Sequence, residues 1–235
     1  MNKKLLILMV CLTAVVSQAS GQSRSKRVRQ PREVVEAFRV CAEFRRLLAE
    51  DLDFDRAFEA TFVKTPTRRR EIAIAESNLG VSDLSQVDDA TLVEIYKNQS
   101  QILILMLPLV FLNQDEKEDF SDPTLEAIIA RVRREGPHNY KDYAHELKRG
   151  VAELRAHVDK RAAQSASVAQ GVRQYKDYLL KPLEPPNRIV KPLTAYSKRR
   201  VLPLKAKYYQ IDDCAVVREG GQMKLIGYTF FSIRW

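Results

Sequence analysis

Residues 102–112, ILILMLPLVFL, form an eleven-residue apolar run that contains a single proline, Pro108. The run is too short to cross a bilayer, which needs roughly 20 apolar residues. A helix that is apolar on all its faces belongs in the centre of a helical bundle. We therefore expect this run to be the hydrophobic centre of the fold, in a helix that kinks or ends near Pro108.

Helical patterns precede this run. Val34 and Cys41 belong to an apolar stripe with spacings of three, four or seven residues, which is typical of an amphipathic helix. Asp53 is placed to cap a second helix. Thr65 followed by Pro66 is the usual start of a third, with a cap and then a first-turn proline. The chain between residues 31 and 112 is therefore predicted to be mainly helical.

A second helical stretch follows at residues 140–179. From Leu147 to Val158 the apolar residues are spaced alternately four and three apart, and the series resumes at Val168 after a ten-residue gap. Inside the gap, Arg161 and Ser165 occupy the positions at which this spacing would place apolar residues. We expect one long helix packed against the bundle, and the alternative is two helices joined near residues 164–167.

The composition changes after residue 181. Half of the ten prolines fall within residues 182–203, and no helix continues through them. Residues 207–218 and 222–235 are rich in β-branched and aromatic residues and flank Gly220 and Gly221, which predicts a β-hairpin with a two-residue turn. The expected cross-strand partners are Val216 with Leu225, Ala215 with Ile226, and Ile211 with Phe230.

Helices first and strands last predict an α+β fold, namely a mainly helical bundle with a C-terminal antiparallel β-hairpin. A curved sheet to which residues 188–204 add strands is the alternative. The expected parts, in chain order, are a signal peptide (1–21), a disordered basic arm (22–30), a helical domain (31–181), a proline-rich basic connector (182–206) and the hairpin packed on the helices (207–235).

Residues 3–19 have the pattern of an export signal. Lys3 and Lys4 precede a mainly apolar stretch, and small residues lead to a cleavage position after Ala19, with Gly21 as the alternative. The pattern is bacterial in style, so we expect a periplasmic or extracellular protein without a transmembrane segment in its mature form. An uncleaved membrane anchor is the other interpretation.

Loss of the signal removes one cysteine and leaves Cys41 and Cys214. Two cysteines in an oxidising compartment invite a disulfide. Each cysteine also suits a small buried apolar position. We expect two separately buried thiols, and the alternative is a Cys41–Cys214 disulfide.

Positive charge is concentrated at the C-terminal end. Residues 22–181 carry 27 basic and 26 acidic residues, whereas residues 182–235 carry 10 and 4. The acid-free stretch 187–207 holds the candidate anion-binding residues, which are Arg188, Lys191, Lys198, Arg199, Arg200, Lys205 and Lys207. The expected partners are anionic envelope materials, namely lipid head groups, lipopolysaccharide or acidic polymers, and nucleic acid is disfavoured. A solvated surface that binds nothing is the alternative.

No pattern in the sequence predicts catalysis, a cofactor or a metal. His138 and His145 are seven residues apart, about 10 Å along a helix, so they cannot share one zinc ion. Asp51, Asp53 and Asp55 have the spacing of a calcium loop, but the sixth loop position is not glycine. We expect helix caps and solvated loops at these acids.

A run of three arginines, residues 68–70, stands at the start of a predicted helix, where positive charge opposes the helix dipole. This position predicts salt bridges to acids elsewhere in the fold. The acids of residues 115–119 cluster in one loop, and we expect them to be solvated.

The leading functional hypothesis is a non-enzymatic exported protein, a binding or envelope-associated module with a basic C-terminal surface. The first alternative is a periplasmic holdase-like helper that presents residues 140–179 to unfolded clients. A hydrolase that uses carboxylates brought together by the fold is less favoured. The sequence does not decide the oligomeric state.

Overall fold

The computed structural model describes residues 29–76, 87–110, 127, 140–184, 189–193 and 207–228. The predicted signal peptide and nearly all of the predicted basic arm lie outside these ranges. The chain divides into two compact units, Met1–Arg29 with Pro185–Ile189, and Gln30–Glu184 with Val190–Trp235. All the helices and strands described below belong to the second unit.

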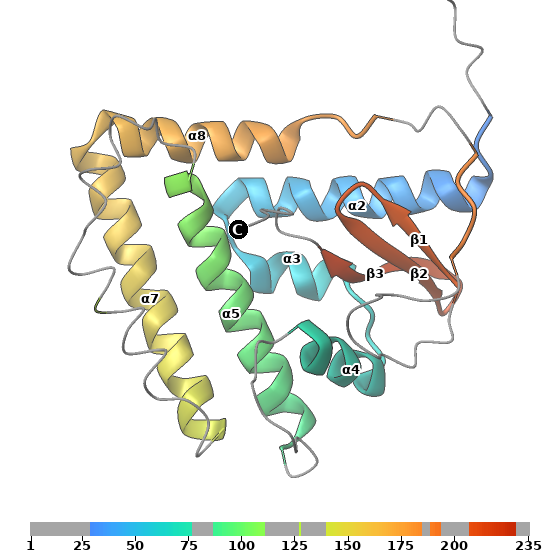
Figure 1. The fold of residues 1–235 in the computed structure, drawn as a ribbon, viewed down its shortest axis with the longest axis horizontal. Coiled ribbons are helices and arrows are strands. Elements are labelled where there is room, and N and C mark those ends of the chain that lie inside the picture. The colour runs from blue at the N-terminus through green and yellow to red at the C-terminus, as the bar shows by residue number, and fades with distance from the viewer. Residues whose placement is uncertain are drawn as a thin grey trace, which may run out of the picture. The chain divides into compact units, whose positions relative to one another are not determined.

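The described helices and strands form an α+β fold, as predicted. The helices are α2 (Arg32–Asp51), α3 (Phe54–Thr61), α4 (Pro66–Glu76), α5 (Asp89–Val110), α7 (Tyr140–Gln164) and α8 (Ala166–Leu180). Figure 1 shows α5 and α7 side by side and α8 running along α2. No helix within the described ranges has the length and apolarity that a bilayer crossing requires.

The expected single helix over residues 140–179 is wrong, because the chain turns at Ser165 between α7 and α8. Ser165 has an extended backbone (φ −126°, ψ 120°), and its hydroxyl accepts a hydrogen bond from the Val168 amide. Serine is a favoured N-cap because its side chain satisfies an amide that the helix leaves unpaired. The gap in the apolar series therefore marks the end of one helix and the cap of the next.

The C-terminal strands are β1 (Tyr208–Ile211), β2 (Cys214–Glu219) and β3 (Gln222–Tyr228), which form an antiparallel sheet in the order β1-β2-β3. The sheet packs on α2 and, through β3, on α4 (Figure 1). The hairpin predicted around Gly220 and Gly221 is present as β2 and β3. Both glycines have positive φ values, 55° and 80°, which a two-residue turn of this kind requires.

The predicted register holds near the turn and fails away from it. Val216 pairs with Leu225 as expected, but a bulge next to Ala215 shifts the pairing by one residue. The expected first strand is also broken in two, because Asp212 and Asp213 make a second tight turn. The corrected pairs are Ala215 with Gly227 and Ile211 with Cys214. The expected partner Phe230 lies outside the described residues.

Part of the predicted connector is joined to the sheet. Leu193 forms an isolated antiparallel bridge with Tyr208, in which each amide donates to the other residue's carbonyl at 2.7 and 3.0 Å. A residue of the proline-rich stretch therefore pairs with the edge of β1. A curved sheet with added strands from residues 188–204 was the alternative fold. Within the described residues, this one bridge is its only support.

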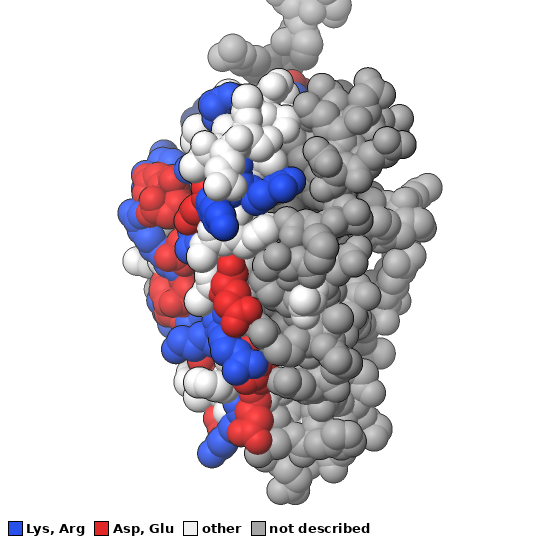
Figure 2. All heavy atoms as spheres, turned by 90° about the vertical axis from the view of Figure 1, so that its left-hand side faces the viewer, with Lys and Arg blue, Asp and Glu red and all other residues white. Residues whose placement is uncertain are grey.

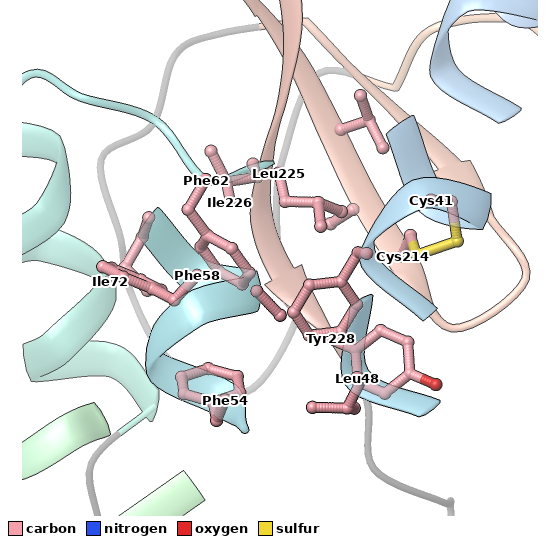
Figure 3. Packing of buried hydrophobic residues seen from close by; sticks show 14 of the residues in the cluster. Cys41, Leu48, Phe54, Phe58, Phe62, Ile72, Cys214, Leu225, Ile226 and Tyr228 are labelled. Atoms are coloured by element: carbon pink, nitrogen blue, oxygen red, sulfur yellow. A yellow bond between two sulfur atoms is a disulfide. The ribbon is translucent and has the colours of Figure 1, made fainter. Parts of the chain in front are cut away.

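The main core lies where α2, α3 and the sheet meet. The rings of Phe44, Phe54, Phe58 and Phe62 contact one another at centroid distances of 4.6 to 6.0 Å, and Tyr228 of β3 joins them (Figure 3). Each phenylalanine is fully buried, which contributes roughly 1.5–3 kcal/mol per ring before entropy costs.

The apolar run on α5 is only partly the centre that we expected. Ile104 and Leu107 join the main core, whereas Leu105 packs in a separate cluster with Leu154 and Val158 of α7. Leu103 is 51% exposed, so α5 is not buried on all sides. The helix continues two residues past Pro108, to Val110, and residues 111–112 lie outside the described chain.

Candidate functional site

Two of the seven predicted anion-binding residues, Lys191 and Lys207, lie within the described chain. Both are exposed, and they lie on either side of the pairing between Leu193 and Tyr208. The other five residues, Arg188, Lys198, Arg199, Arg200 and Lys205, lie outside the described chain. The structure thus locates two bases of the stretch, Lys191 and Lys207, near the edge of β1.

A groove of about 880 Å³ lies between α3, α4, α5 and α7, and we call it the four-helix groove. Its charged lining is balanced between the two signs. The acids are Asp53, Asp55, Glu59, Asp89 and Glu94, and the bases are Lys64, Arg69, Lys97, Lys148 and Arg155. The sequence did not reveal this groove, because its residues come from four separate helical segments.

Glu59 is the best-connected carboxylate of the four-helix groove. It lies 2.8 Å from Arg69 and 3.3 Å from Lys97. Burial acts to raise the pKa of Glu59, but the hydrogen bonds and charges of Arg69 and Lys97 outweigh it and lower the pKa to about 2. Glu59 is therefore ionised at neutral pH and is poorly suited to donate or accept a proton in catalysis.

The three acids at the junction of α2 and α3 serve as a helix cap and in ion pairs. Asp53 is the N-cap of α3, and its side chain accepts a hydrogen bond from the Arg56 amide at 3.1 Å. Asp51 pairs with Arg56 at 2.7 Å, and Asp55 pairs with Lys97. The described residues contain no group of three or more side chains that could hold a metal ion.

The three arginines at the start of α4 have acidic partners in other segments, as predicted. The pairs are Arg68 with Glu219 at 3.9 Å, Arg69 with Glu59 at 2.8 Å and Arg70 with Asp89 at 2.7 Å. Glu219 also accepts hydrogen bonds from the amides of Lys64 and Thr65 at 2.6 and 3.3 Å. A carboxylate from β2 therefore lies at the N-terminus of α4 and offsets the positive charge there.

A disulfide joins Cys41 of α2 to Cys214 of β2, with the two Cα atoms 5.9 Å apart. Both cysteines are fully buried. The expectation of two separate thiols is therefore wrong, and the alternative is what the structure contains. The sequence could not decide between them, because the sulfurs meet only when the sheet packs on α2.

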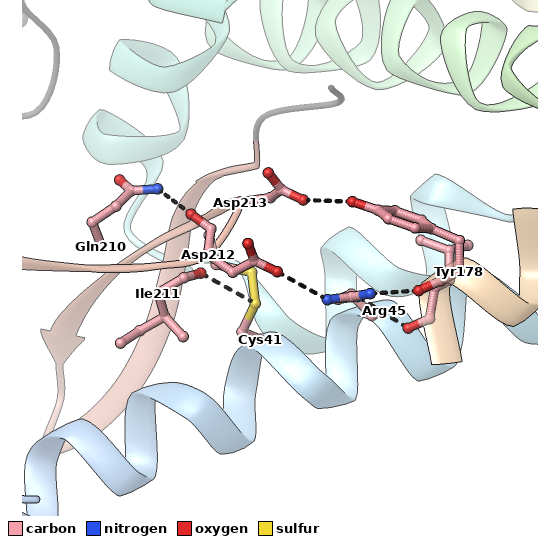
Figure 4. The surroundings of a disulfide bond; sticks show 9 residues. Cys41, Arg45, Tyr178, Gln210, Ile211, Asp212 and Asp213 are labelled. Carbon is pink, nitrogen blue, oxygen red and sulfur yellow. Dashed lines mark hydrogen bonds and ion pairs between the residues drawn. A yellow bond between two sulfur atoms is a disulfide. The ribbon is translucent and has the colours of Figure 1, made fainter. Parts of the chain in front are cut away.

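Arg45 lies one helical turn after Cys41 and is also buried, with its side chain 4% exposed. Its guanidinium donates to the carbonyls of Tyr178 and Leu179 at the end of α8 and to the Asp212 carboxylate at 3.2 Å (Figure 4). The last carbonyls of a helix lack intrahelical donors, so Arg45 supplies hydrogen-bond donors to the carbonyls at the end of α8. It also lies 5.3 Å from the centre of the Tyr178 ring.

We call this site the disulfide corner; its residues are Cys41, Arg45, Tyr178, Leu179, Asp212, Asp213 and Cys214. Within it, the Tyr178 hydroxyl donates to the Asp213 carboxylate at 3.2 Å. Burial and the neighbouring Asp212 charge raise the pKa of Asp213, against the opposing effects of Tyr178 and Arg45. Sequence reasoning missed this site. The partial signal in the sequence was Arg45, a charged residue inside the apolar stripe of α2.

On the face that carries α7, the described residues mix positive and negative side chains. Figure 2 shows basic and acidic side chains interspersed over the described residues of this face. His145 and His157 both lie on α7, and His138 lies outside the described residues. This mixture agrees with the nearly equal numbers of basic and acidic residues in the helical part of the sequence.

Comparison of the chain with protein-family models, with curated proteins and with solved structures finds no match.

Proposed function

We propose that this protein is an exported, non-enzymatic binding module that associates with anionic envelope material through its basic C-terminal stretch, residues 187–207. The observation that carries the export part is the Cys41–Cys214 disulfide. Disulfides persist in oxidising compartments and are rare in the cytosol. The disulfide and the export signal of residues 3–19 are independent features that favour the same location.

The binding part rests on charge. The acid-free stretch carries seven bases, and its two described members, Lys191 and Lys207, are exposed at the edge of β1. An exposed basic segment attracts phosphate and carboxylate groups, with a strength that falls as salt is added. The helices offer no comparable attraction, because their basic and acidic residues are nearly equal in number.

The geometry of the four-helix groove gives no support to the hydrolase alternative. A general acid or base works best with a pKa near the operating pH. The pKa of Glu59 is lowered to about 2, and Asp55 is paired with Lys97. Glu59, the carboxylate of the groove with the most ion pairs, is held in its ionised form by its neighbouring cations.

The holdase alternative also loses its main support. It requires an apolar surface on residues 140–179 that unfolded clients can reach. Leu147, Leu154 and Val158 of α7 and Tyr175 of α8 are buried against other elements of the same chain. These apolar residues of α7 and α8 therefore serve packing within the chain.

Co-sedimentation with vesicles tests the proposal. The full chain is mixed with phosphatidylglycerol vesicles, with phosphatidylcholine vesicles as the neutral control, at increasing salt. We expect binding to the anionic vesicles only, and a loss of roughly a hundred-fold in affinity when Lys198, Arg199 and Arg200 are all changed to Glu, since each base near the surface contributes about 1 kcal/mol.

The matched control changes Lys160, Arg173 and Lys181 to Glu. These residues are exposed on α7, on α8 and at the end of α8, and their replacement alters the net charge by the same amount. The control variant should keep most of the binding. Equal losses in both variants would show that binding depends only on net charge, which would contradict a role for the basic stretch. Unchanged binding in the Lys198, Arg199 and Arg200 variant would also contradict the proposal.

A further inference from the structure

The disulfide corner is where the first described helix, the end of α8 and the first turn of the sheet meet (Figure 4). Cys41 and Cys214 are separated by 173 residues, so their bond ties one end of the described fold to the other. Arg45 adds hydrogen bonds to α8 and to the Asp212 carboxylate in the same place. The disulfide is the only covalent link between these described elements apart from the chain itself.

The turn just before Cys214 is formed by Asp212 and Asp213, and its features require partners elsewhere in the fold. Asp212 has a φ of 50°, a left-handed conformation that residues with a side chain adopt less readily than glycine. Two carboxylates stand side by side in this turn, and the Asp213 side chain is partly buried. The turn therefore depends on partners outside itself, which are Arg45, Tyr178 and the Cys41 sulfur.

The same turn determines where β1 lies, and β1 is linked to the basic stretch. Lys207 directly precedes β1, and Leu193 exchanges two backbone hydrogen bonds with Tyr208, the first residue of β1. Whatever fixes β1 on α2 therefore also fixes Leu193 and Lys207, two residues of the candidate binding segment.

We propose that the Cys41–Cys214 disulfide is a redox-sensitive clamp, which seats β1 and its turn on α2 when it is formed and releases them when it is reduced. This inference deepens the proposed function and rests on it, since seating β1 positions the basic stretch for binding. The chain completes its binding-competent form only after it reaches an oxidising compartment.

The chemistry is thiol–disulfide exchange with a small or protein disulfide of the compartment. A Cys thiolate attacks that disulfide and displaces one of its sulfurs as a thiol, and the second Cys then attacks the mixed disulfide and displaces the other. Two protein thiols are oxidised, one external disulfide is reduced to two thiols, and two protons pass to the leaving sulfurs. Both protein sulfurs are fully buried in the clamped state, so the reverse reaction requires the disulfide corner to open first.

The effect should be largest near the disulfide corner, because the far side of the bundle has a buried cluster of its own that meets the main core through Val172 of α8. Leu105, Leu154 and Val158 form a cluster of their own between α5 and α7. Loss of the clamp removes no contact from this cluster. We therefore expect β1 to loosen while α7 stays folded.

Amide hydrogen exchange measures this directly on the full chain. The oxidised protein is compared with a Cys41→Ala/Cys214→Ala variant and with the wild-type protein reduced by a phosphine. We expect amides of β1 to exchange at least ten-fold faster without the disulfide, while amides of α7 change less than three-fold. Unchanged β1 exchange would overturn the clamp, and so would an equal acceleration in α7, which would mean general destabilisation.

Vesicle binding separates this inference from the proposed function. Oxidised and reduced proteins are both tested on phosphatidylglycerol vesicles, and we expect the reduced form to bind at least ten-fold more weakly. If neither form binds, the proposed function fails, while hydrogen exchange still decides whether the clamp exists. If both forms bind equally, the coupling between the disulfide and the basic stretch is contradicted.

Discussion

The disulfide corner and the four-helix groove both place arginine beside carboxylate, but they differ in burial. In the corner, the Arg45 side chain is 4% exposed and reaches two helix carbonyls as well as Asp212. In the groove, Arg69 is 17% exposed, and its partner Glu59 shares its charge among Arg69, Lys97 and Lys64. Exposed ion pairs are screened by water and salt, whereas a buried donor that is removed leaves its acceptors unsatisfied.

This difference implies a division of roles. The few polar contacts of the disulfide corner hold α2, α8 and the sheet together, so each of them matters to the fold. The many ion pairs of the four-helix groove are redundant, because each of several cations can replace another beside Glu59. Charge count is therefore a poor guide to which region stabilises this protein.

Replacing Arg45 should have the largest effect on stability and tests this comparison most strongly. An Arg45→Met variant removes the buried side-chain donor from the carbonyls of Tyr178 and Leu179, of which Tyr178 keeps the Lys181 amide, and we expect it to lower the free energy of unfolding by about 2–4 kcal/mol. Chemical denaturation followed by circular dichroism measures the change. The neighbouring Arg46 is the matched control, because its side chain is 49% exposed and pairs with Glu43 and Glu50.

An Arg46→Met variant should unfold close to the wild-type midpoint. If the two variants lose equal stability, burial does not distinguish the corner from an exposed ion-pair network, and the comparison above is wrong.

Replacing Asp213 should have a smaller effect on the free energy of unfolding, and one of opposite sign. Because burial and Asp212 raise its folded pKa above 3.8, Asp213 favours the folded state when it is protonated, and this contribution is lost as pH rises through the folded pKa. An Asp213→Asn variant should therefore be at least as stable as wild type at pH 7, with an advantage that vanishes as pH falls below about 3.8. Thermal unfolding at several pH values measures this, and a destabilised variant at pH 7 would contradict it.

The smallest effect is expected at Glu59. Because its pKa falls from 4.5 to about 2, it stabilises the fold above pH 4.5, and this contribution is lost as pH drops from 4.5 toward 2. A Glu59→Gln variant should unfold slightly earlier than wild type at pH 7 and show a flatter pH dependence below 4.5. An unchanged slope would show that the groove carboxylate does not interact with its cations as described. High salt should shrink the difference, since the pair is exposed.

Features set by neighbouring residues were predictable from the sequence. Asp53 caps α3, Pro66 begins α4, and Gly220 with Gly221 makes the hairpin turn, because each depends on a few residues of local backbone. The prediction of one helix over residues 140–179 was wrong, because the gap in the apolar series before Val168 contains the cap residue Ser165. The spacing of apolar residues alone does not reveal a cap.

Features set by distant residues were not predictable. The disulfide needs Cys41 and Cys214 to meet across the whole described fold, and the role of Arg45 depends on where α8 ends and where β1 turns. The four-helix groove draws on four segments, so no spacing within any one of them reveals it. Lys191 and Lys207 were identified from charge, and their place at the sheet edge came only from the bridge to Tyr208.

The most direct test of the account is a peptide map of the protein purified without reductant, denatured, and alkylated before digestion. The account predicts that the peptides containing Cys41 and Cys214 are recovered as one linked pair, and that reduction separates them into two alkylatable thiols. Recovery of both cysteines already alkylated in the unreduced sample would contradict the disulfide corner and the oxidising location inferred from it.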